Sequence, residues 1–443
     1  MRIPKSAIAL LPFALASMVF LAGCVKSDPP RFNLNMVEVA EKELTLEQQQ
    51  TDADVLEALF GTPDDPFVLP ETKLNLDKIR LAAGPVWSDQ HGKERGLFRR
   101  HCVHCHGITG DGAGPTAAIL NPYPRDYRQG KFKFKSTERA AMPTDADLKR
   151  ILHDGVPDTA MPSFALLPDD EIEALVEYVK YLSMRGQTEI KLIDEITQVS
   201  EGEKLPLNRE MLVDNLLDGA AKKWATAADQ VVFPPEPPAR TGSALEQSIA
   251  AGRTLYYGTI ANCFKCHGPS ALGDGQASDY DDWNTQVHKL EQALGDSDAI
   301  AQRRATIIKD ADENAEKTRQ DKELSAEDKE TALKSIEEQK AQAIYALDLK
   351  YKVIEALPYP PRTITPRNLR AGVYRGGRRP LDIFHRLYTG INGTPMPAVG
   401  PATPGGKGTL TPEQMWNLVD YVLSLPYEAI SRPPRPANPL AQD

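Results

Sequence analysis

Cys102-Val103-His104-Cys105-His106 is a short cysteine-histidine run, and Cys263-Phe264-Lys265-Cys266-His267 repeats its pattern later in the chain. The pattern C-x-x-C-H is typical of covalent attachment of a c-type haem. Two thiols three positions apart can each form a thioether with one vinyl group of the porphyrin, and the histidine that follows can then bind the iron. A zinc half-site and a thioredoxin-like redox pair are the competing interpretations of a bare C-x-x-C, but a zinc site would need two further ligands for each copy.

The cysteine count agrees with this interpretation, because four of the five cysteines lie in the two motifs. The fifth, Cys24, follows a positively charged start and an apolar run at 7–20, which is too short for a membrane span and is interrupted by Pro12. The sequence Leu21-Ala22-Gly23-Cys24 resembles the bacterial lipoprotein box, in which the cysteine is lipidated and becomes the first mature residue. The alternative is an ordinary cleavable signal. The resemblance implies a lipid-anchored protein on the periplasmic face of a bacterial membrane.

Composition sets broad limits on the fold and on the partners. A length of 443 residues allows two to four domains, and 41% hydrophobic with 26% charged residues is ordinary for a soluble globular chain. The net charge of -10 argues against a nucleic acid as partner.

The segment around the first motif predicts one helical domain at 84–186. A helix over residues 90–100 is expected to lead into Cys102. Thr144 followed by Asp147 is typical of a capping box and predicts a helix over 144–154. Apolar residues at helical spacing predict a last helix over 168–183.

A second domain, at 242–430, repeats this plan, which indicates an internal duplication. Residues of the first domain recur 235 positions later around the Met-Pro pairs, 242 positions later around the Pro-Arg pairs and 243 positions later in the last helix. The matched sets are Asp147, Leu152, Gly155, Thr159, Met161 and Pro162 with Asp382, Leu387, Gly390, Thr394, Met396 and Pro397; Pro124, Arg125 and Gly130 with Pro366, Arg367 and Gly372; and residues 175–179 with residues 418–422.

The rest of the chain falls into connecting segments. An insert at 285–355, rich in Ala, Glu, Lys and Gln, predicts two long helices in a projecting hairpin, with Ser325 and Asp328 at a helix start. It is interpreted as a solvated structural insert, the alternative being a docking arm for a partner. The remaining assignments are a signal peptide at 1–23, a tether and packing arm at 24–83 with a helix over 46–60, a linker at 187–241 that is helical over 209–229 and then proline-rich, and a disordered tail at 431–443.

Both domains resemble class I c-type cytochromes: a helix before C-x-x-C-H, a loop with a distal Met-Pro, and a last helix. The resemblance covers half to two thirds of the chain and implies an all-α fold with two haems c. It implies covalent attachment at Cys102, Cys105, Cys263 and Cys266, and axial pairs of His106 with Met161 and of His267 with Met396. His153 and His385 are the spare candidates if a methionine fails. Arg125 and Arg367 are proposed to contact haem propionates, the alternative being ordinary surface arginines.

The function implied is that of an electron carrier rather than an enzyme. A thioether ligand favours ferrous iron and raises the reduction potential, and filling both axial positions leaves no open position for a substrate. The expected partners are other redox proteins or a membrane respiratory complex, with the lipid as membrane anchor. A dihaem enzyme such as a cytochrome c peroxidase is the alternative, since those proteins also carry two C-x-x-C-H motifs but work with an open or displaceable axial site.

Overall fold

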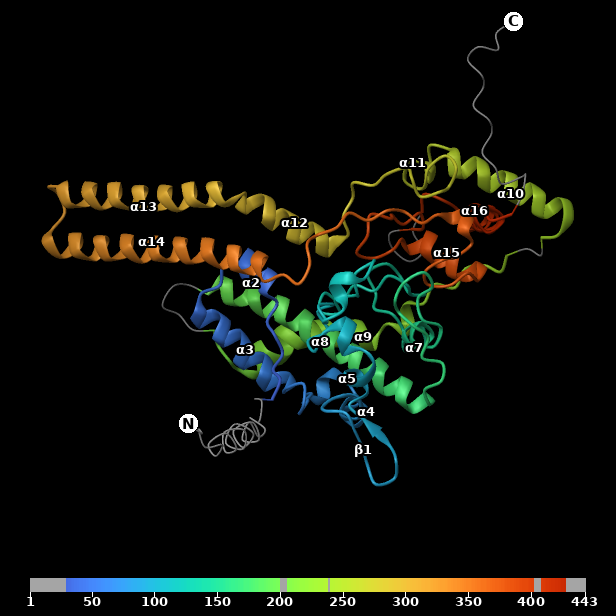
Figure 1. The fold of residues 1–443 in the computed structure, drawn as a ribbon, viewed down its shortest axis with the longest axis horizontal. Helices are drawn as coiled ribbons and strands as arrows, with labels where there is room; N and C mark the ends of the chain where they lie inside the picture. The colour runs from blue at the N-terminus through green and yellow to red at the C-terminus, as the bar shows by residue number, and fades with distance from the viewer. Residues whose placement is uncertain (1–28, 200–204, 238–239, 402–407, 428–443) are drawn as a thin grey trace, which may run out of the picture.

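The computed structural model describes residues 29–199, 205–237, 240–401 and 408–427. These residues form helices joined by long loops, with one two-stranded antiparallel sheet made of β1 (Trp87–Ser88) and β2 (Glu94–Arg95) (Figure 1). The all-α class expected from the sequence is confirmed. The expected signal peptide, the Cys24 lipidation site and the C-terminal tail at 431–443 lie outside the described residues.

The N-terminal arm is part of the first hydrophobic core. Helices α3 (Leu46–Phe60) and α4 (Leu76–Ala82) pack against the long helix α8 (Asp169–Gln198). Thr45 and Gln48 close a capping box at the start of α3, and the predicted helix over 46–60 is confirmed. Phe60 and Tyr181 are fully buried, and the Tyr181 hydroxyl donates to the Phe60 carbonyl at 2.6 Å. The arm therefore stabilises the helix that backs the first motif.

A carboxyl group is buried between the arm and α8. Asp52 is fully buried, and neither of its carboxylate oxygens has a hydrogen-bond partner among the described residues. Glu189, also fully buried, pairs with Arg185 at 3.2 Å. Burial and the nearby Glu189 carboxylate raise the pKa of Asp52 to about 8, although Arg185 acts in the opposite direction. Asp52 is therefore protonated in the folded chain at neutral pH.

Asp52→Asn is expected to stabilise the folded protein increasingly as the pH rises. The folded pKa of Asp52 lies above the unfolded value, so the wild-type chain loses unfolding free energy between about pH 4 and the folded pKa of about 8. The asparagine carries no such proton. Its unfolding free energy relative to wild type should rise by up to about 1.4 kcal/mol per pH unit in this window. Thermal unfolding at pH 5 and pH 8 measures the effect, with Asp54→Asn on the exposed side of α3 as control; an equal difference at both pH values would contradict it.

The chain approaches the first motif differently from the sequence-based prediction. The expected helix over 90–100 is wrong in its first half, where β1 and β2 form a hairpin. Gly96 has a φ of 70° and separates this hairpin from α5 (Leu97–His101), which leads into α6 (Val103–His106). The predicted capping box of Thr144 and Asp147 is confirmed at the start of α7 (Asp145–Asp154). Helix α8 continues past residue 186, where the first domain was expected to end.

Two helices of the second half cross at a glycine. Helix α10 (Gly242–Tyr257) packs across α16 (Pro412–Ser424). A β-carbon placed on Gly252 would lie 2.0 Å from the Asn417 carbonyl oxygen, so a larger residue would push the two helices apart. Outside the insert, the described residues of this half also form α11 (Phe264–His267), η6 (Leu369–Ala371) and α15 (Pro380–Thr389). Elsewhere the chain forms η2 (Pro70–Thr72), η3 (Ala117–Ile119), η4 (Glu210–Leu217), α9 (Asp218–Ala225) and η5 (Ala228–Gln230).

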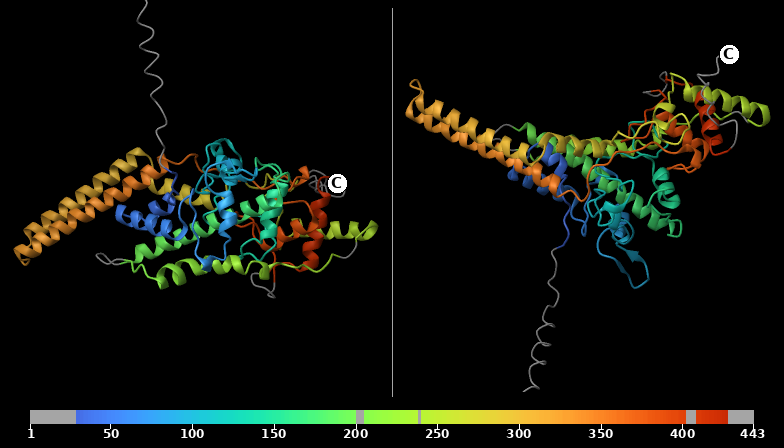
Figure 2. Two further views of the ribbon diagram at one scale, coloured as in Figure 1. Left: turned by 90° about the horizontal axis from the view of Figure 1, so that it is seen from below. Right: turned by 45° about the horizontal axis from the view of Figure 1, so that its top comes forward.

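The insert contains three helices, not the two predicted. They are α12 (Asp282–Leu294), α13 (Ser297–Gln320) and α14 (Ala326–Glu355), and Ser325 caps α14 as expected. Helices α13 and α14 form a hairpin that extends away from the rest of the molecule in all three views (Figures 1 and 2). Its base packs on α2 (Met36–Glu41) and α8 through a core of Val37, Val39, Ala40, Leu44, Ile193, Val287, Leu290, Leu349 and Val353. The insert is therefore fastened to the N-terminal arm.

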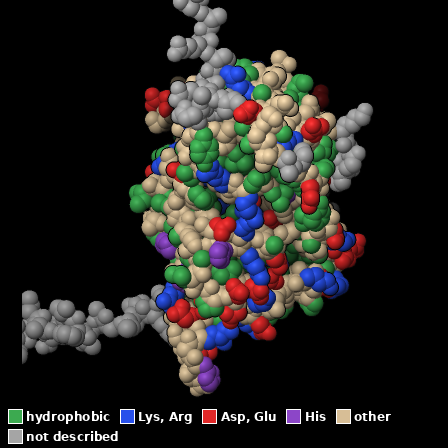
Figure 3. All heavy atoms as spheres, turned by 90° about the vertical axis from the view of Figure 1, so that its right-hand side faces the viewer, with side chains coloured by type: hydrophobic (Ala, Val, Ile, Leu, Met, Phe, Trp, Pro, Cys, Tyr) green, Lys and Arg blue, Asp and Glu red, His purple; other side chains and the backbone are tan. Residues whose placement is uncertain are grey.

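The surface at the end of the molecule away from this hairpin carries side chains of both charges. Lysine and arginine are intermixed with aspartate and glutamate over this face in Figure 3. Within the described part of the chain, no helix combines the length and the apolar character needed to cross a membrane.

Candidate functional site

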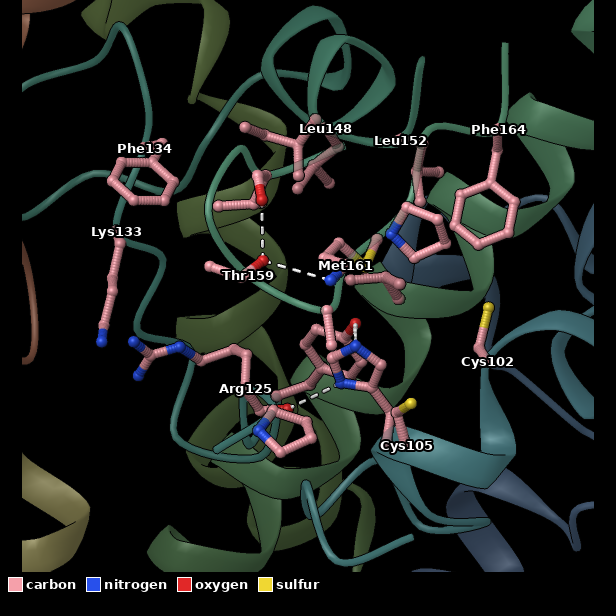
Figure 4. Close-up of a pocket in the computed structure, with 18 of the residues that line it drawn as sticks. Cys102, Cys105, Arg125, Lys133, Phe134, Leu148, Leu152, Thr159, Met161 and Phe164 are labelled. Carbon is pink, nitrogen blue, oxygen red and sulfur yellow. Dashed lines mark hydrogen bonds between the residues drawn. The ribbon is translucent and has the colours of Figure 1, made fainter. Parts of the chain in front are cut away.

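A cavity lies directly beside the first C-x-x-C-H motif. Its wall is largely apolar, with Leu148 and Leu152 from α7 and Leu175 and Val179 from α8. Cys102, Cys105 and His106 line it from α6 and the residue before that helix, and Met161 lines it from the loop between α7 and α8. Figure 4 shows Cys102 at one end of the cavity and Arg125 and Lys133 at the other. The structure thus gathers both thiols, the histidine and the methionine predicted for the first site around one space.

A backbone hydrogen bond fixes the His106 ring. Its Nδ1–H donates to the Arg125 carbonyl oxygen at 3.0 Å, which leaves Nε2 with the lone pair that a metal requires. Burial lowers the pKa of His106 to about 4, so the imidazole is neutral. Tyr127 stacks on the ring with its centroid 4.8 Å away, and its hydroxyl lies 3.2 Å from Nε2. A metal bound at Nε2 would replace that hydroxyl contact.

Two of the four motif thiols, those of Cys102 and Cys263, are buried where the protonated form is favoured. Burial raises the pKa of Cys102 to about 12 and that of Cys263 to about 11. A thioredoxin-like pair needs the opposite, a thiol whose pKa is lowered so that the thiolate can attack. In the described part of the chain no group of three or more His, Cys, Asp or Glu side chains is placed to hold a metal ion. The raised pKa values of Cys102 and Cys263 disfavour the redox-pair interpretation.

The loop with Met161 is built by a repeated set of hydrogen bonds. The Met161 N–H donates to Thr159 Oγ1 at 3.1 Å, and that hydroxyl donates to the Val156 carbonyl at 2.7 Å. In the second half the Met396 N–H donates to Thr394 Oγ1 at 3.3 Å. The glycine before each loop has a positive φ, 69° at Gly155 and 70° at Gly390, and a β-carbon there would collide with the backbone of the Met-Pro pair. The two methionine loops therefore share one local structure.

The second motif repeats the histidine geometry of the first. The His267 Nδ1–H donates to the Arg367 carbonyl oxygen at 3.2 Å, as His106 does to Arg125. Burial lowers the pKa of His267. Cys263 and Met396 both pack against the second hydrophobic core. The second half thus repeats the histidine–carbonyl bond of the first site and places Cys263 and Met396 against one core.

The two predicted propionate arginines differ in their surroundings. Arg125 lines the first cavity, and burial lowers the pKa of its guanidinium. Arg367 instead pairs through its guanidinium with Asp158, which lies in the first half of the chain. Two further cations, Lys133 and Arg375, also line the first cavity, and the sequence analysis did not single them out.

His153 and His385, the alternative ligand candidates, do not line the first cavity. His153 is exposed and contacts Asp154, and His385 binds the Val232 carbonyl through Nε2 at 3.0 Å. His101 and His104 also line the first cavity, and neither is among the ligand candidates predicted from the sequence. Their position next to the cysteines was the available signal.

The first cavity therefore fits haem c in its donor set and in its polarity. Two thiols lie at one end, a neutral histidine and a thioether line the space, and cations lie at the far end, where the carboxylates of a haem attached through its vinyl groups would lie. The apolar wall suits the porphyrin plane.

Comparison with known proteins agrees with this geometry. Residues 92–183 match the model of the family described as cytochrome c, which supports haem c binding and electron transfer by this part of the chain. Comparison with curated proteins gives no match. A solved structure of the reducing HAO-like protein complex of Kuenenia stuttgartiensis aligns with 76% of this chain and 97% of its own, at 22% identity and a TM-score of 0.43. That degree of likeness carries no conclusion about activity.

Proposed function

We propose that the protein is a dihaem c-type cytochrome that passes single electrons between redox partners. The observation that carries the proposal is the cavity that places Cys102, Cys105, His106 and Met161 around one space. The cytochrome c domain at residues 92–183 supports haem binding and electron transfer for the first half.

The second haem is proposed from the repeat in local geometry. His267 bonds to the Arg367 carbonyl as His106 bonds to that of Arg125, and the Met396 turn repeats the Met161 turn. These hydrogen bonds orient each imidazole ring and fix the backbone of each methionine, so their repetition supports a second site with Cys263 and Cys266 as attachment points.

The chain's residues would supply attachment, axial ligation and burial. A backbone carbonyl holds both His106 and His267 in one tautomer, which leaves Nε2 as the nitrogen that would bind the haem iron. Met161 and Met396 would each supply a thioether as the second protein ligand, and the apolar walls would keep water away. Haem c held in this way supplies a one-electron couple of raised potential. With both axial positions filled, no position remains for a substrate, and the role is that of a carrier.

The location and partners are proposed from the N-terminal sequence and the accessory segments. The lipoprotein-like Leu21-Ala22-Gly23-Cys24 supports a lipid anchor at Cys24 and a periplasmic location. The projecting α13–α14 hairpin and the packed N-terminal arm add structure that a single freely diffusing haem domain does not need. We propose a partner in a membrane respiratory complex.

A haem count combined with an optical redox titration tests this function. Mature protein made in a host that attaches c-type haem should carry two haems per chain. Both should titrate at high potential, both should show the sulfur-to-iron band in the far red, and neither should bind carbon monoxide when reduced. One haem that binds carbon monoxide or turns over peroxide would contradict the carrier role and indicate a dihaem enzyme such as a peroxidase.

A further inference from the structure

The two halves of the chain touch at the loop before Met161. The Arg367 guanidinium pairs with the Asp158 carboxylate, three residues before Met161. Arg375 donates to the Asp158 carbonyl oxygen at 3.2 Å, and its guanidinium lies 3.4 Å from the carboxylate. Two cations of the second half are therefore held at the methionine loop of the first half.

The equivalent contact in the opposite direction lacks its carboxylate. In the register of the repeat, Arg125 corresponds to Arg367, and Gly393, 235 positions after Asp158, takes the aspartate's place. Arg125 does lie against Gly393, because a β-carbon placed on that glycine would be 3.5 Å from Arg125 Nη1. Among the described residues, Arg125 has no ion-pair partner within 4.0 Å. The same crossing therefore occurs twice, once with an ion pair and once with an unpaired arginine.

Three cations converge on the first cavity. Arg125 and Lys133 come from the first half, and Arg375 comes from the second. Lys133 has a carboxylate, that of Asp281, at 3.7 Å, and Arg375 shares Asp158 with Arg367. The Nε atom of Arg375 is buried without a hydrogen-bond partner among the described residues, as is that of Arg367. Like charges gathered in an apolar cavity repel one another and need an anion to offset them.

We propose that the carboxylate edge of the first haem is held by both halves of the chain, by Arg125 from one side and by Arg375 from the other. Because Gly393 has no carboxylate, Arg125 can bind the haem carboxylates. Arg367 instead connects the two halves through its ion pair with Asp158. The inference rests on the proposed function and extends it, because it assigns a haem-binding role to Arg375 and a different role to Arg367. The first site is then complete only when the second half is in place.

The reduction potential reports on this arrangement. Ferric haem carries one positive charge more than ferrous haem, so a nearby cation disfavours the oxidised form and raises the potential. A carboxylate placed against Arg125 should lower the potential of the first haem. For unit charges about 10 Å apart at an effective dielectric constant of about 20, the reduction equilibrium shifts about tenfold, or about 59 mV for one electron.

Gly393→Asp installs that carboxylate, and Gly393→Asn is its uncharged control. Asparagine and aspartate are among the non-glycine residues found most often in this backbone region: Gly393 has a φ of 71°, and Asp158 at the equivalent position has a φ of 58°. The aspartate variant should lower the potential of the first haem, with its reduction equilibrium constant falling about tenfold. The asparagine variant should leave the potential near the wild-type value. Equal potentials for both variants would overturn the role of Gly393.

The variants Arg375→Gln and Arg367→Gln distinguish a residue that contacts the haem from one that only joins the two halves through Asp158. Each removes one cation from the same aspartate, Asp158, but only Arg375 lines the cavity. Arg375→Gln should lower the potential of the first haem, and Arg367→Gln should leave that potential unchanged. Equal shifts in both variants would mean that Arg375 acts only through Asp158, which overturns the inference.

The haem count distinguishes failure of this inference from failure of the proposed function. Met396→Ala moves the transition of the second haem and so assigns the other transition to the first. Two haems per chain with no shift in Gly393→Asp or Arg375→Gln would overturn the inference alone. Fewer than two haems in the wild-type protein would overturn the dihaem function as well.

Discussion

Replacing Cys102 and Cys105 together with alanine is expected to remove one covalent haem per chain and leave the other. Thioether attachment needs these two sulfurs, and both line the cavity. The Cys263 and Cys266 double variant should lose the other haem, and all four substitutions together should leave none. Intact-chain mass and the pyridine haemochrome absorbance per mole of protein measure the count.

The control for the cysteine variants is His104→Gln. His104 lies between the two cysteines, so its replacement disturbs the same segment but removes no attachment point. It should keep both haems. A double-cysteine variant at 102 and 105 that still gains the mass of two haems would contradict the assignment.

Loss of one haem should also lower the melting temperature of the variant, because the apolar cavity wall would face water.

Met161→Ala is expected to lower the potential of the first haem by on the order of 100 mV or more and to open one axial position. The thioether that favours ferrous iron is lost, and a small ligand can then reach the metal. The reduced variant should bind carbon monoxide at one haem, and the sulfur-to-iron band should fall by about half if two such haems are present. Met396→Ala should have the same effect on the other haem.

Met142→Leu is the matched control for Met161. Met142 is a buried methionine of the same hydrophobic core but does not line the cavity. Its replacement should leave both potentials and the carbon monoxide result unchanged. A Met161→Ala protein with an unaltered first potential and no carbon monoxide binding would show that another residue is the ligand. His385 is a poor candidate for an iron ligand, since its Nε2–H already donates to the Val232 carbonyl oxygen.

The helices predicted correctly are those with a local signal. The capping box at Thr144 involves residues three positions apart and places the start of α7, and apolar residues on one side of the segment 46–60 indicate α3. The helix predicted over 90–100 failed because Gly92 and Gly96, both with positive φ, allow a hairpin that the apolar pattern did not exclude. In the insert, Gly295 ends α12 and splits what the pattern indicated as one helix.

In the candidate site, too, the residues in short local motifs were predicted from the sequence and the others were not. The first motif, its histidine and the Met161 turn were all identified from sequence, because each is a short segment whose spacing has a chemical purpose. Lys133 and Arg375 were missed, since neither belongs to a motif. Arg367 was assigned by its place in the repeat, but the repeat could not reveal Asp158, which lies 209 residues away in sequence and pairs with its guanidinium.

The sequence by itself determined the elements that depend on near neighbours: two C-x-x-C-H motifs, a methionine turn after each, and the capped helices around them. The tertiary structure alone decided how the copies are joined. The base of the insert lies on the N-terminal arm because Val39 and Leu290 bury apolar surface against each other's helices. Arg375 reaches the cavity of the other half because two folded loops meet there. Such contacts depend on shape and charge across hundreds of residues, which no local pattern records.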